Sequence, residues 1–572
     1  MIILLSLLTS LSCRHKAEAD IILINGKIIT VDSAFSVHEA IALAGDKILA
    51  TGSDEEIKSY SGRNTIVIDL KGKTVLPGLI DAHLHPDAAA VSELREDIPD
   101  VENIDELLDW IGAEAAEKKK GEWIVFQKFF FTRMKEMRMP SLEELDKAAP
   151  DNPVFLNGSF GGIINSCAMK VSGISSGSSD PGVIKNSKTG KPTGFIRASA
   201  FQLLNIPKAE QLSREEWIDA FQKMMSKYNQ SGITSVFAGT GNMKTVETYR
   251  HLADSNMLTV RIFQNILYTP GDTITYESVS NYLKKFNEVT GSGNEWVRVG
   301  PLKVFLDGGI LTGTAYMKEP LNTNALNIFH FENASYRGVS NLSKEQLLSI
   351  VSAANDAGWS FTAHATGDAS TGMLIDVYNE VSSKSSIKSK RFSVIHGNFF
   401  DEQVQVRMKE MNVYANIQPA WYFKDADAML RIHGEDKMRI FQPYRSMISK
   451  GIILNGGSDH MVKLDADASI NPYNPFTAMW SMVTRKTING TVIMPEEAIS
   501  REDAIKCYTI NNARASFEEN IKGSLEPGKL ADMVIISSDI LTCNPDSIRN
   551  IKALMTILGG KIVWDALQTA SH

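Results

Sequence analysis

The chain has 572 residues, of which 43% are hydrophobic and 22% are charged, and its formal net charge at pH 7 is −8. A chain of this length contains more than one ordinary domain, and its composition is that of a folded soluble protein. The negative net charge argues against nucleic acid or an anionic membrane surface as a partner. We therefore expect a small molecule as the ligand or substrate.

The first segment, MIILLSLLTSLSC, is an apolar run of about signal-peptide length that ends at Cys13. It is too short to span a bilayer as a helix. It resembles a bacterial lipoprotein signal, although no lysine or arginine precedes the run and Ser10 stands where leucine is usual. We expect residues 1–19 to be a leader and the protein to be exported, either periplasmic or anchored to the membrane by a lipid on Cys13. A misassigned start would instead leave a cytoplasmic protein.

The two ends of the chain after residue 19 have the same sequence pattern. Residues 20–75 are short β-branched runs broken by turns such as Asn25-Gly26, and residues 515–572 contain the similar runs LADMVIIS and ALMTILGGKIVWD. This pattern predicts hairpins in series. Because chain termini often lie close together, we expect both ends to build one small β-sandwich domain.

The middle of the chain, residues 76–514, alternates strand-length apolar runs with helix-compatible segments. Eight near-continuously apolar strands separated by helices are typical of an α/β fold of the (β/α)₈ TIM-barrel type. A doubly wound open sheet is the alternative, but no G-x-G-x-x-G follows the first run. Residues 93–199 are too long for a simple connection, so we expect an inserted subdomain that covers the barrel mouth. The eight runs are LIDAHLH, ITSVFAG, LTVRIFQNIL, VGPLKVFLDG, WSFTAHATG, RFSVIHG, VYANIQP and IILNGGSDH.

Polar residues stand at the ends of these apolar runs. In GLIDAHLHPD, His83 and His85 are two positions apart, so a strand would point both imidazoles to one face. Such a pair binds metal only if further ligands arrive, and an isolated H-x-H is more often two hydrogen-bonded histidines. Catalytic residues of TIM barrels lie at the carboxyl ends of the strands, and four further candidates occur there. They are Lys303, His364, His396 and Asp459.

Lys303 lies inside the apolar run PLKVFLDGG. Burying a charged lysine is costly, so its pKa should fall and its neutral amine should become available for chemistry. The alternative is a buried ion pair with Asp307 or another carboxylate.

Together these motifs resemble the amidohydrolase superfamily. The flanking phrases DLKGKTVLPGLIDAHLH, GSLEPGKLADMVI and GGKIVW are similar to its signature ends. The segments GWSFTAHATGDAS and KVFLDGGILTGTA, with the long insertion, resemble one branch, amidohydrolase family 3, which includes N-substituted formamide deformylases. The likeness runs from about Asp20 to Trp564.

The resemblance implies a binuclear site for two divalent metal ions, with zinc as the expected ion. His83 and His85 would hold one ion, and His364 and His396 the other. Lys303, carboxylated on its amine, would bridge the two ions as an anionic oxygen ligand.

The same resemblance implies hydrolysis of a carbon–nitrogen bond other than a peptide bond, by a hydroxide between the two ions. Asp459 would ligate the first ion and act as general base and then general acid. An ester or lactone hydrolase on the same site is an alternative function, and a non-catalytic solute-binding lipoprotein is a second one. The sequence carries no signal for an oligomeric state.

The expected substrate pocket departs from the family pattern. In SFGGIINSCAM, Gly161 and Gly162 stand where relatives usually have a histidine, shortly before Asn165. SDHMV replaces the more usual SDAPV, so His460 adjoins Asp459. The candidate substrate contacts are His460, which could equally be a supporting or surface histidine, Thr312 and Asn165.

Overall fold

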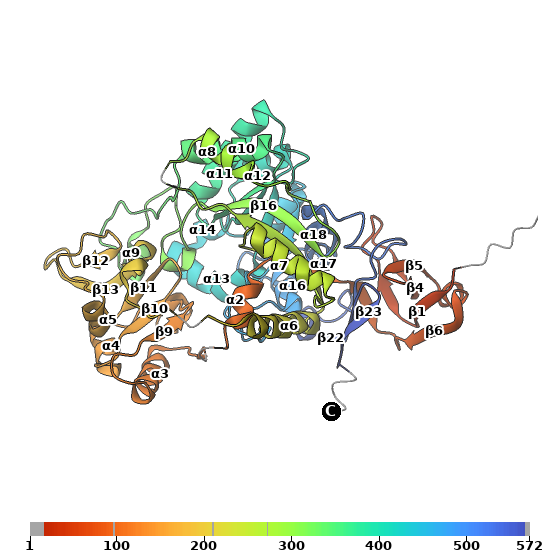
Figure 1. Ribbon diagram of the computed structural model, residues 1–572, viewed down its shortest axis with the longest axis horizontal. Coiled ribbons are helices and arrows are strands. Elements are labelled where there is room, and N and C mark those ends of the chain that lie inside the picture. Colours follow the sequence, from red (N-terminus) through yellow and green to blue (C-terminus); the bar gives the residue numbers. More distant parts are fainter. Residues whose placement is uncertain (1–16, 95–97, 209–210, 272, 567–572) are drawn as a thin grey trace, which may run out of the picture.

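The computed structural model describes residues 17–94, 98–208, 211–271 and 273–566. Most of the expected leader, including Cys13, lies outside these residues, so export and lipidation stay predictions. None of the helices in the described ranges combines the length and the hydropathy that a membrane-spanning segment requires. Figure 1 shows a central α/β body, with strands of the N-terminal segment at one end and strands of the insertion at the other.

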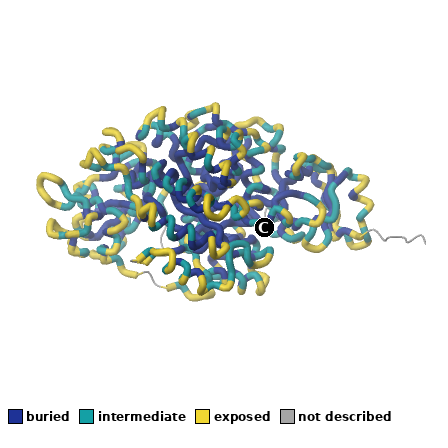
Figure 2. The backbone as a smooth tube through the Cα atoms, turned by 90° about the horizontal axis from the view of Figure 1, so that it is seen from above, coloured by how far each residue is buried: buried dark blue, intermediate teal, exposed yellow. Residues whose placement is uncertain are grey.

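Eight parallel strands form the central barrel, in the order β20-β19-β18-β17-β16-β15-β14-β8. Each strand coincides with one of the eight apolar runs, so the predicted (β/α)₈ barrel is confirmed. The strands are almost wholly buried because helices cover their outer face, and Figure 2 shows this buried centre. They are β8 (Leu79–Leu84), β14 (Ile233–Ala238), β15 (Arg261–Leu267), β16 (Val297–Phe305), β17 (Phe361–Ala365), β18 (Ser393–His396), β19 (Tyr414–Ile417) and β20 (Leu454–Gly456).

The first and last barrel strands meet through the backbone that follows them. The N–H of Asp459 donates to the carbonyl of His83 at 2.6 Å, and the N–H of His85 donates to the carbonyl of His460 at 2.7 Å. The buried Asp81 adds a side-chain link, because its Oδ1 accepts from the backbone N–H groups of His83 and Ser458. The barrel therefore closes at the residues predicted to carry the chemistry.

The outer helices follow from apolar periodicity and capping. In α6 (Arg214–Gln230), Phe221, Met224, Met225 and Tyr228 are buried on one face. Its start is a capping box between Ser213 and Glu216. The other helices of the barrel region are α2 (Pro86–Val91), α7 (Met243–Asp254), α8 (Tyr276–Leu283), α9 (Thr323–Ile328), α10 (Lys344–Asp356), α11 (Asp368–Lys384), α12 (Glu402–Met411), α13 (Pro419–His433), α14 (Glu435–Met438), α15 (Tyr444–Ser449), α16 (Pro475–Thr484), α17 (Arg501–Cys507) and α18 (Ile510–Ala515).

Two sheets are built from the ends of the chain. One has the order β5-β4-β1-β6, and the other, β23-β22-β21-β7-β2-β3, joins strands from both termini. Side chains from both sheets, such as Leu43 and Ile557, share one buried cluster. This arrangement agrees with a composite domain, although its boundaries stay a prediction. The elements are β1 (Ala19–Ile24), β2 (Lys27–Ile29), β3 (Val37–His38), β4 (Ala40–Ala44), β5 (Lys47–Gly52), α1 (Asp54–Lys58), β6 (Ser61–Asp69), β7 (Thr74–Pro77), β21 (Met533–Ile536), β22 (Ala553–Leu558) and β23 (Lys561–Asp565).

The segment between β8 and β14 contains a sheet of its own, in the order β12-β13-β11-β10-β9. Its buried residues Phe131 and Leu156 belong to the same apolar cluster as Leu311 and Tyr422 of the barrel region, so the insertion packs on that region. Its elements are α3 (Ile104–Glu117), β9 (Ile124–Gln127), α4 (Leu142–Ala148), β10 (Val154–Asn157), β11 (Gly161–Ile164), α5 (Ser166–Val171), β12 (Val183–Lys185) and β13 (Pro192–Arg197).

One buried ion pair joins the barrel to the six-stranded terminal sheet. Arg261 at the start of β15 contacts Asp532, just before β21, through two hydrogen bonds of 2.7 and 3.0 Å. The two side chains are only 2% and 5% exposed. Removing one partner leaves the other charge buried and unpaired, which is more costly than losing an exposed pair.

Asp532→Asn should therefore lower the free energy of unfolding by about 3–5 kcal/mol, measured by urea denaturation followed by circular dichroism. Asp151→Asn is the matched control, because Asp151 pairs with Lys120 at the surface, where the side chains are 53% and 83% exposed. The control should leave the denaturation midpoint unchanged. A loss below about 1 kcal/mol in Asp532→Asn, against that predicted cost, would contradict the assigned role.

Candidate active site

A cavity of about 1250 Å³ opens at the carboxyl end of the barrel. Its wall includes side chains of the insertion, such as Trp123 and Phe160, and of the loop that contains Leu311 and Thr312. Residues of the insertion therefore contribute to the wall of the cavity. All six predicted metal and catalytic residues also line this cavity, namely His83, His85, Lys303, His364, His396 and Asp459.

The imidazoles of the H-x-H pair converge on one carboxylate. Oδ1 of Asp459 lies 3.4 Å from Nε2 of His83 and 3.2 Å from Nε2 of His85. β8 ends at Leu84, and His85 is the residue that precedes α2. The other ring nitrogen of His85 contacts the hydroxyl of Thr240 at 3.1 Å, which holds Nε2 toward the cavity.

Three residues from three different strand ends form a compact ligand set. His83, His396 and Asp459 each offer one ligand atom, and these atoms all lie within 4.8 Å of one another. The Nδ1–H of His396 donates to Gln418 Oε1 at 2.8 Å, which leaves Nε2 as the ring nitrogen available to a cation. The ring of His396 also stacks on Trp421, with 4.5 Å between centroids.

Two further predicted ligands, Lys303 and His364, lie beside this set. Nζ of Lys303 is 3.5 Å from Nε2 of His83. The ring of His364 is 4.6 Å from that of His396, but its Nε2–H donates to the carbonyl of Gly308 at 2.9 Å. His364 therefore borders the three-residue set, with its Nε2 directed to the backbone.

Close backbone approach and left-handed backbone conformations shape the site. A Cβ on Gly457 would lie 2.5 Å from the backbone nitrogen of His83, so only glycine fits there. Asp459 and His396 have φ angles of +57° and +73°. Such conformations cost about 1–3 kcal/mol each in residues with a side chain and occur preferentially at functional sites.

Burial sets the protonation states of the site. It lowers the pKa of His83 to about 3 and that of His396 well below its usual value. Burial alone would raise the pKa of Asp459, but hydrogen bonds from His83 and His85 hold it well below its usual range. Neutral imidazoles and an ionised carboxylate are the forms that bind a divalent cation, so the residues present fit a metal site.

Burial also lowers the pKa of Lys303 to about 8, while the charge of Asp459 opposes this shift. The side chain is 1% exposed. Among the described residues, no carboxylate lies within ion-pair distance of its Nζ, so the alternative pair with Asp307 does not form. A neutral amine in the site is therefore accessible near neutral pH.

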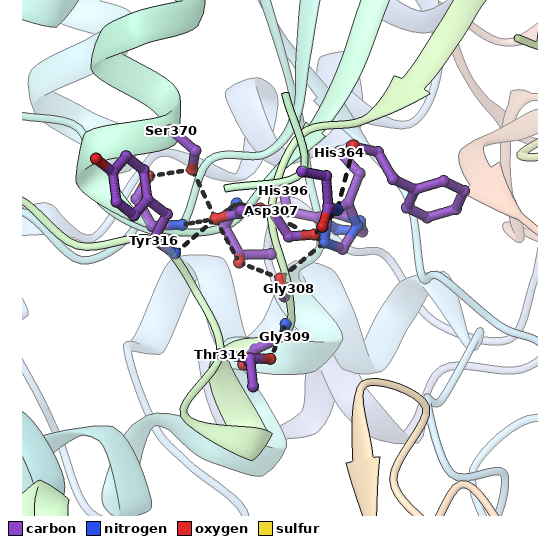
Figure 3. A network of polar contacts seen from close by, with 12 residues as sticks. Asp307, Gly308, Gly309, Thr314, Tyr316, His364, Ser370 and His396 are labelled. Carbon is purple, nitrogen blue, oxygen red and sulfur yellow. Dashed lines mark hydrogen bonds and ion pairs between the residues drawn. The ribbon is translucent and has the colours of Figure 1, made fainter. Parts of the chain in front are cut away.

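Asp307 organises the loop behind His364 instead (Figure 3). Its carboxylate accepts hydrogen bonds from the backbone N–H groups of Tyr316, Thr366 and Gly367 and from the hydroxyls of Thr366 and Ser370. Burial raises the pKa of the Asp307 carboxyl group. The neighbouring His364 and the hydrogen bonds that the carboxylate accepts oppose this shift. The network fixes the start of α11 and the loop from Gly308 to Tyr316 against the site.

Two of the three predicted substrate contacts, His460 and Asn165, do not line the cavity. The ring of His460 is fully buried outside the cavity wall, where it accepts from the Tyr228 hydroxyl at 3.0 Å and donates to the carbonyl of Lys463 at 2.7 Å. Asn165 is also fully buried, because it caps α5 and bonds the backbone of neighbouring turns of the insertion. Thr312 does line the cavity, and its hydroxyl donates to the carbonyl of Gly309.

Sequence reasoning missed several side chains that border the site. Gln418 orients His396, and Asn471 donates to the backbone carbonyl of Asp459 at 2.9 Å. Lys128 of the insertion lines the same cavity. Gln418 and Lys128 carried a usable signal, because they directly follow the apolar runs YANI and WIVFQ, as the predicted site residues stand at the ends of their own runs. Asn471 carried none.

Comparisons with known proteins agree with this geometry. The sequence model of the Amidohydrolase family (Amidohydro_3) matches residues 66–564. The chain is 26% identical to the N-substituted formamide deformylase of Arthrobacter pascens, over 96% of this chain and 98% of that protein. It is 27% identical to the protein LONG AFTER FAR-RED 3 of Arabidopsis thaliana, over 98% and 94% of the two chains.

Among solved structures, the chain is similar to an uncharacterized metal-dependent hydrolase from Pyrococcus horikoshii, with a TM-score of 0.66 and 21% identity. This alignment covers 92% of the present chain and 99% of the other. It supports the fold alone, whereas the family match extends over most of the sequence. The chain therefore belongs to the amidohydrolase family.

Proposed function

We propose that this protein hydrolyses a carbon–nitrogen bond other than a peptide bond, such as the amide of an N-substituted formamide, with the help of divalent metal ions. The observation that carries the proposal is the buried set of His83, His396 and Asp459 at the mouth of an amidohydrolase barrel. The similarity to a formamide deformylase over 96% of the chain supports the choice of bond.

In this proposal two ions, with zinc as the expected metal, are held by the six residues of the site. When bound, such ions lower the pKa of a water molecule and polarise the scissile carbonyl group. His83, His85 and Asp459 would hold one ion, and His396 would hold the other. His364 would join His396 once its Nε2 leaves the carbonyl of Gly308.

We also propose that Lys303 is carboxylated. Its neutral amine would attack carbon dioxide and form an N–C bond. The nitrogen would then transfer one proton to water, and the product would be an anionic carbamate. The lowered pKa of the amine and its position 3.5 Å from His83 support this step. A carbamate supplies the oxygen ligands that a site rich in imidazole otherwise lacks.

Asp459 is the residue proposed to move the proton. Its carboxylate is ionised and faces the cavity, so it can accept a proton from the attacking water and pass it to the leaving amine. Asn471 holds the backbone of Asp459, and aromatic walls such as Trp421 and Phe160 exclude water from the reacting group.

Substrate screening tests the reaction type. The metal-loaded protein should show a higher kcat/KM for N-formyl amines than for N-acyl amines, cyclic amides and lactones. The same site chemistry acts on all of them, but a relative that matches 96% of the chain is a formamide deformylase. Turnover confined to lactones would favour the ester hydrolase. Binding of these compounds without any turnover would favour the solute-binding protein.

Two substitutions separate proton transfer from metal binding. Asp459→Asn should keep most of the metal and lose about 10²- to 10⁴-fold in kcat, because a proton-transfer group contributes this much. His83→Ala should lose metal and activity together, since one ion would retain a single imidazole from the H-x-H pair. Metal content is measured by mass spectrometry, with about two equivalents expected in the wild type. Near wild-type turnover in Asp459→Asn would remove this residue from the mechanism.

Export is a separate proposal that rests on the apolar leader and Cys13. The full-length chain expressed in a bacterium should partition with membranes, and Cys13→Ala should release it, because the lipid would be attached to that thiol. Fractionation with mass spectrometry of the N-terminal peptide measures this. Recovery of the wild type in the cytosol with Met1 retained would contradict the proposal.

A further inference from the structure

A lysine from the insertion is held inside the active-site cavity. β9 and β10 are adjacent parallel strands, with Gln127 paired to Asn157 at their carboxyl ends. Lys128 directly follows the end of β9, and Ser159 is the second residue after the end of β10. Nζ of Lys128 donates to Oγ of Ser159 at 2.9 Å. Both residues line the cavity that contains the predicted metal ligands.

The backbone that presents this pair is held in a costly conformation. Lys128 has a φ of +59° and Ser159 a φ of +73°. The side chain of Asn157 accepts from the N–H of Ser159 at 2.8 Å and donates to Gln127 at 2.9 Å, which ties the two turns together. Left-handed conformations at residues with side chains cost about 1–3 kcal/mol each and persist mainly where a site requires them.

The ammonium group lacks a counter-charge of its own. Among the described residues, no carboxylate lies within 4.0 Å of Nζ of Lys128, and its hydrogen-bond partner Ser159 is uncharged. Burial lowers the pKa of Lys128, and the charge of Asp459 opposes that shift. Asp459 is already engaged by His83 and His85, and it is a predicted metal ligand. An anion brought by the substrate would supply the missing charge.

The rest of the cavity is suited to an apolar body. Aromatic and aliphatic side chains form much of its wall, among them Trp123, Phe130, Phe160, Leu311 and Trp421. A ligand that fits combines an anionic group near Lys128 with an apolar portion along this wall.

We propose that Lys128 binds a carboxylate of the substrate and thereby selects N-acyl amino acids, in particular N-formyl amino acids, over neutral amides. This inference rests on the proposed function. A formyl group has no carbon on which to carry a carboxylate, so the carboxylate belongs to the substituent on nitrogen. Ser159 is the positioning residue, because it holds the lysine through its hydroxyl.

The experiment uses the metal-loaded protein and two matched series of compounds. N-formylglycine, N-formyl-β-alanine and N-formyl-γ-aminobutyrate place a carboxylate at increasing distance from the amide, and each is compared with its own primary amide. Binding is measured by calorimetry and turnover by amine release. The wild type should prefer the acid over the amide, at the best chain length, by roughly 10- to 100-fold, which is the effect of a hydrogen bond to a charged group.

Lys128→Met should abolish this acid-over-amide preference, and Lys128→Arg should retain part of it because the charge is kept. Lys208→Met is the matched control, since Lys208 is an exposed lysine lining the same cavity, and it should leave the preference intact. Metal content must match the wild type in every variant.

The outcomes distinguish this inference from the proposed function. A binding preference for acids that Lys128→Met removes, without turnover of any compound, would support the carboxylate site and contradict the hydrolase. Equal losses on acids and amides in Lys128→Met would overturn the carboxylate site and point to a role at the scissile carbonyl. The absence of any acid preference in the wild type would also overturn it.

Discussion

The site depends on how the barrel closes. β8 and the backbone after β20 are joined by two hydrogen bonds, from Asp459 to His83 and from His85 to His460. Residues almost 380 positions apart in sequence are thereby placed side by side, and the H-x-H pair faces the carboxylate. Gly457 permits this approach, because any side chain there would collide with the backbone of His83. Without closure, the imidazoles and the carboxylate would lie on opposite edges of an open sheet.

Burial then gives these groups their chemistry. The same exclusion of water that keeps the imidazoles neutral lowers the pKa of Lys303, and the imidazole contacts keep Asp459 ionised. Neutral imidazoles around an ionised carboxylate are the protonation states in which these groups bind a divalent cation. Asp307 stays outside this balance, because five donors from the loop and from α11 occupy it.

The barrel and the insertion contribute different residues to the cavity. Strand ends of the barrel hold the residues proposed for metal binding and proton transfer, while β9 and β10 of the insertion present Lys128 and Ser159 from a separate sheet. If both proposals hold, catalytic chemistry and substrate choice lie on separate segments and can change independently, as is common where loops vary on a TIM barrel. The Arg261–Asp532 ion pair joins the barrel to the terminal sheet, and neither of its residues lines the cavity.

The sequence by itself determined the eight barrel strands and the six candidate site residues. Both depend on local patterns: continuous apolar runs mark strands covered on both faces, and polar residues at their carboxyl ends meet at one barrel face. Partners distant in the chain were decided only by the tertiary structure. His460 adjoins Asp459 in sequence, yet its ring turns to Tyr228, 232 positions away. Asn165 caps a helix of the insertion, and Lys128 reaches the cavity only because two strands bring it beside Ser159. The direction of a side chain depends on packing between segments that are distant in the sequence. A local sequence pattern does not specify which segments will pack together.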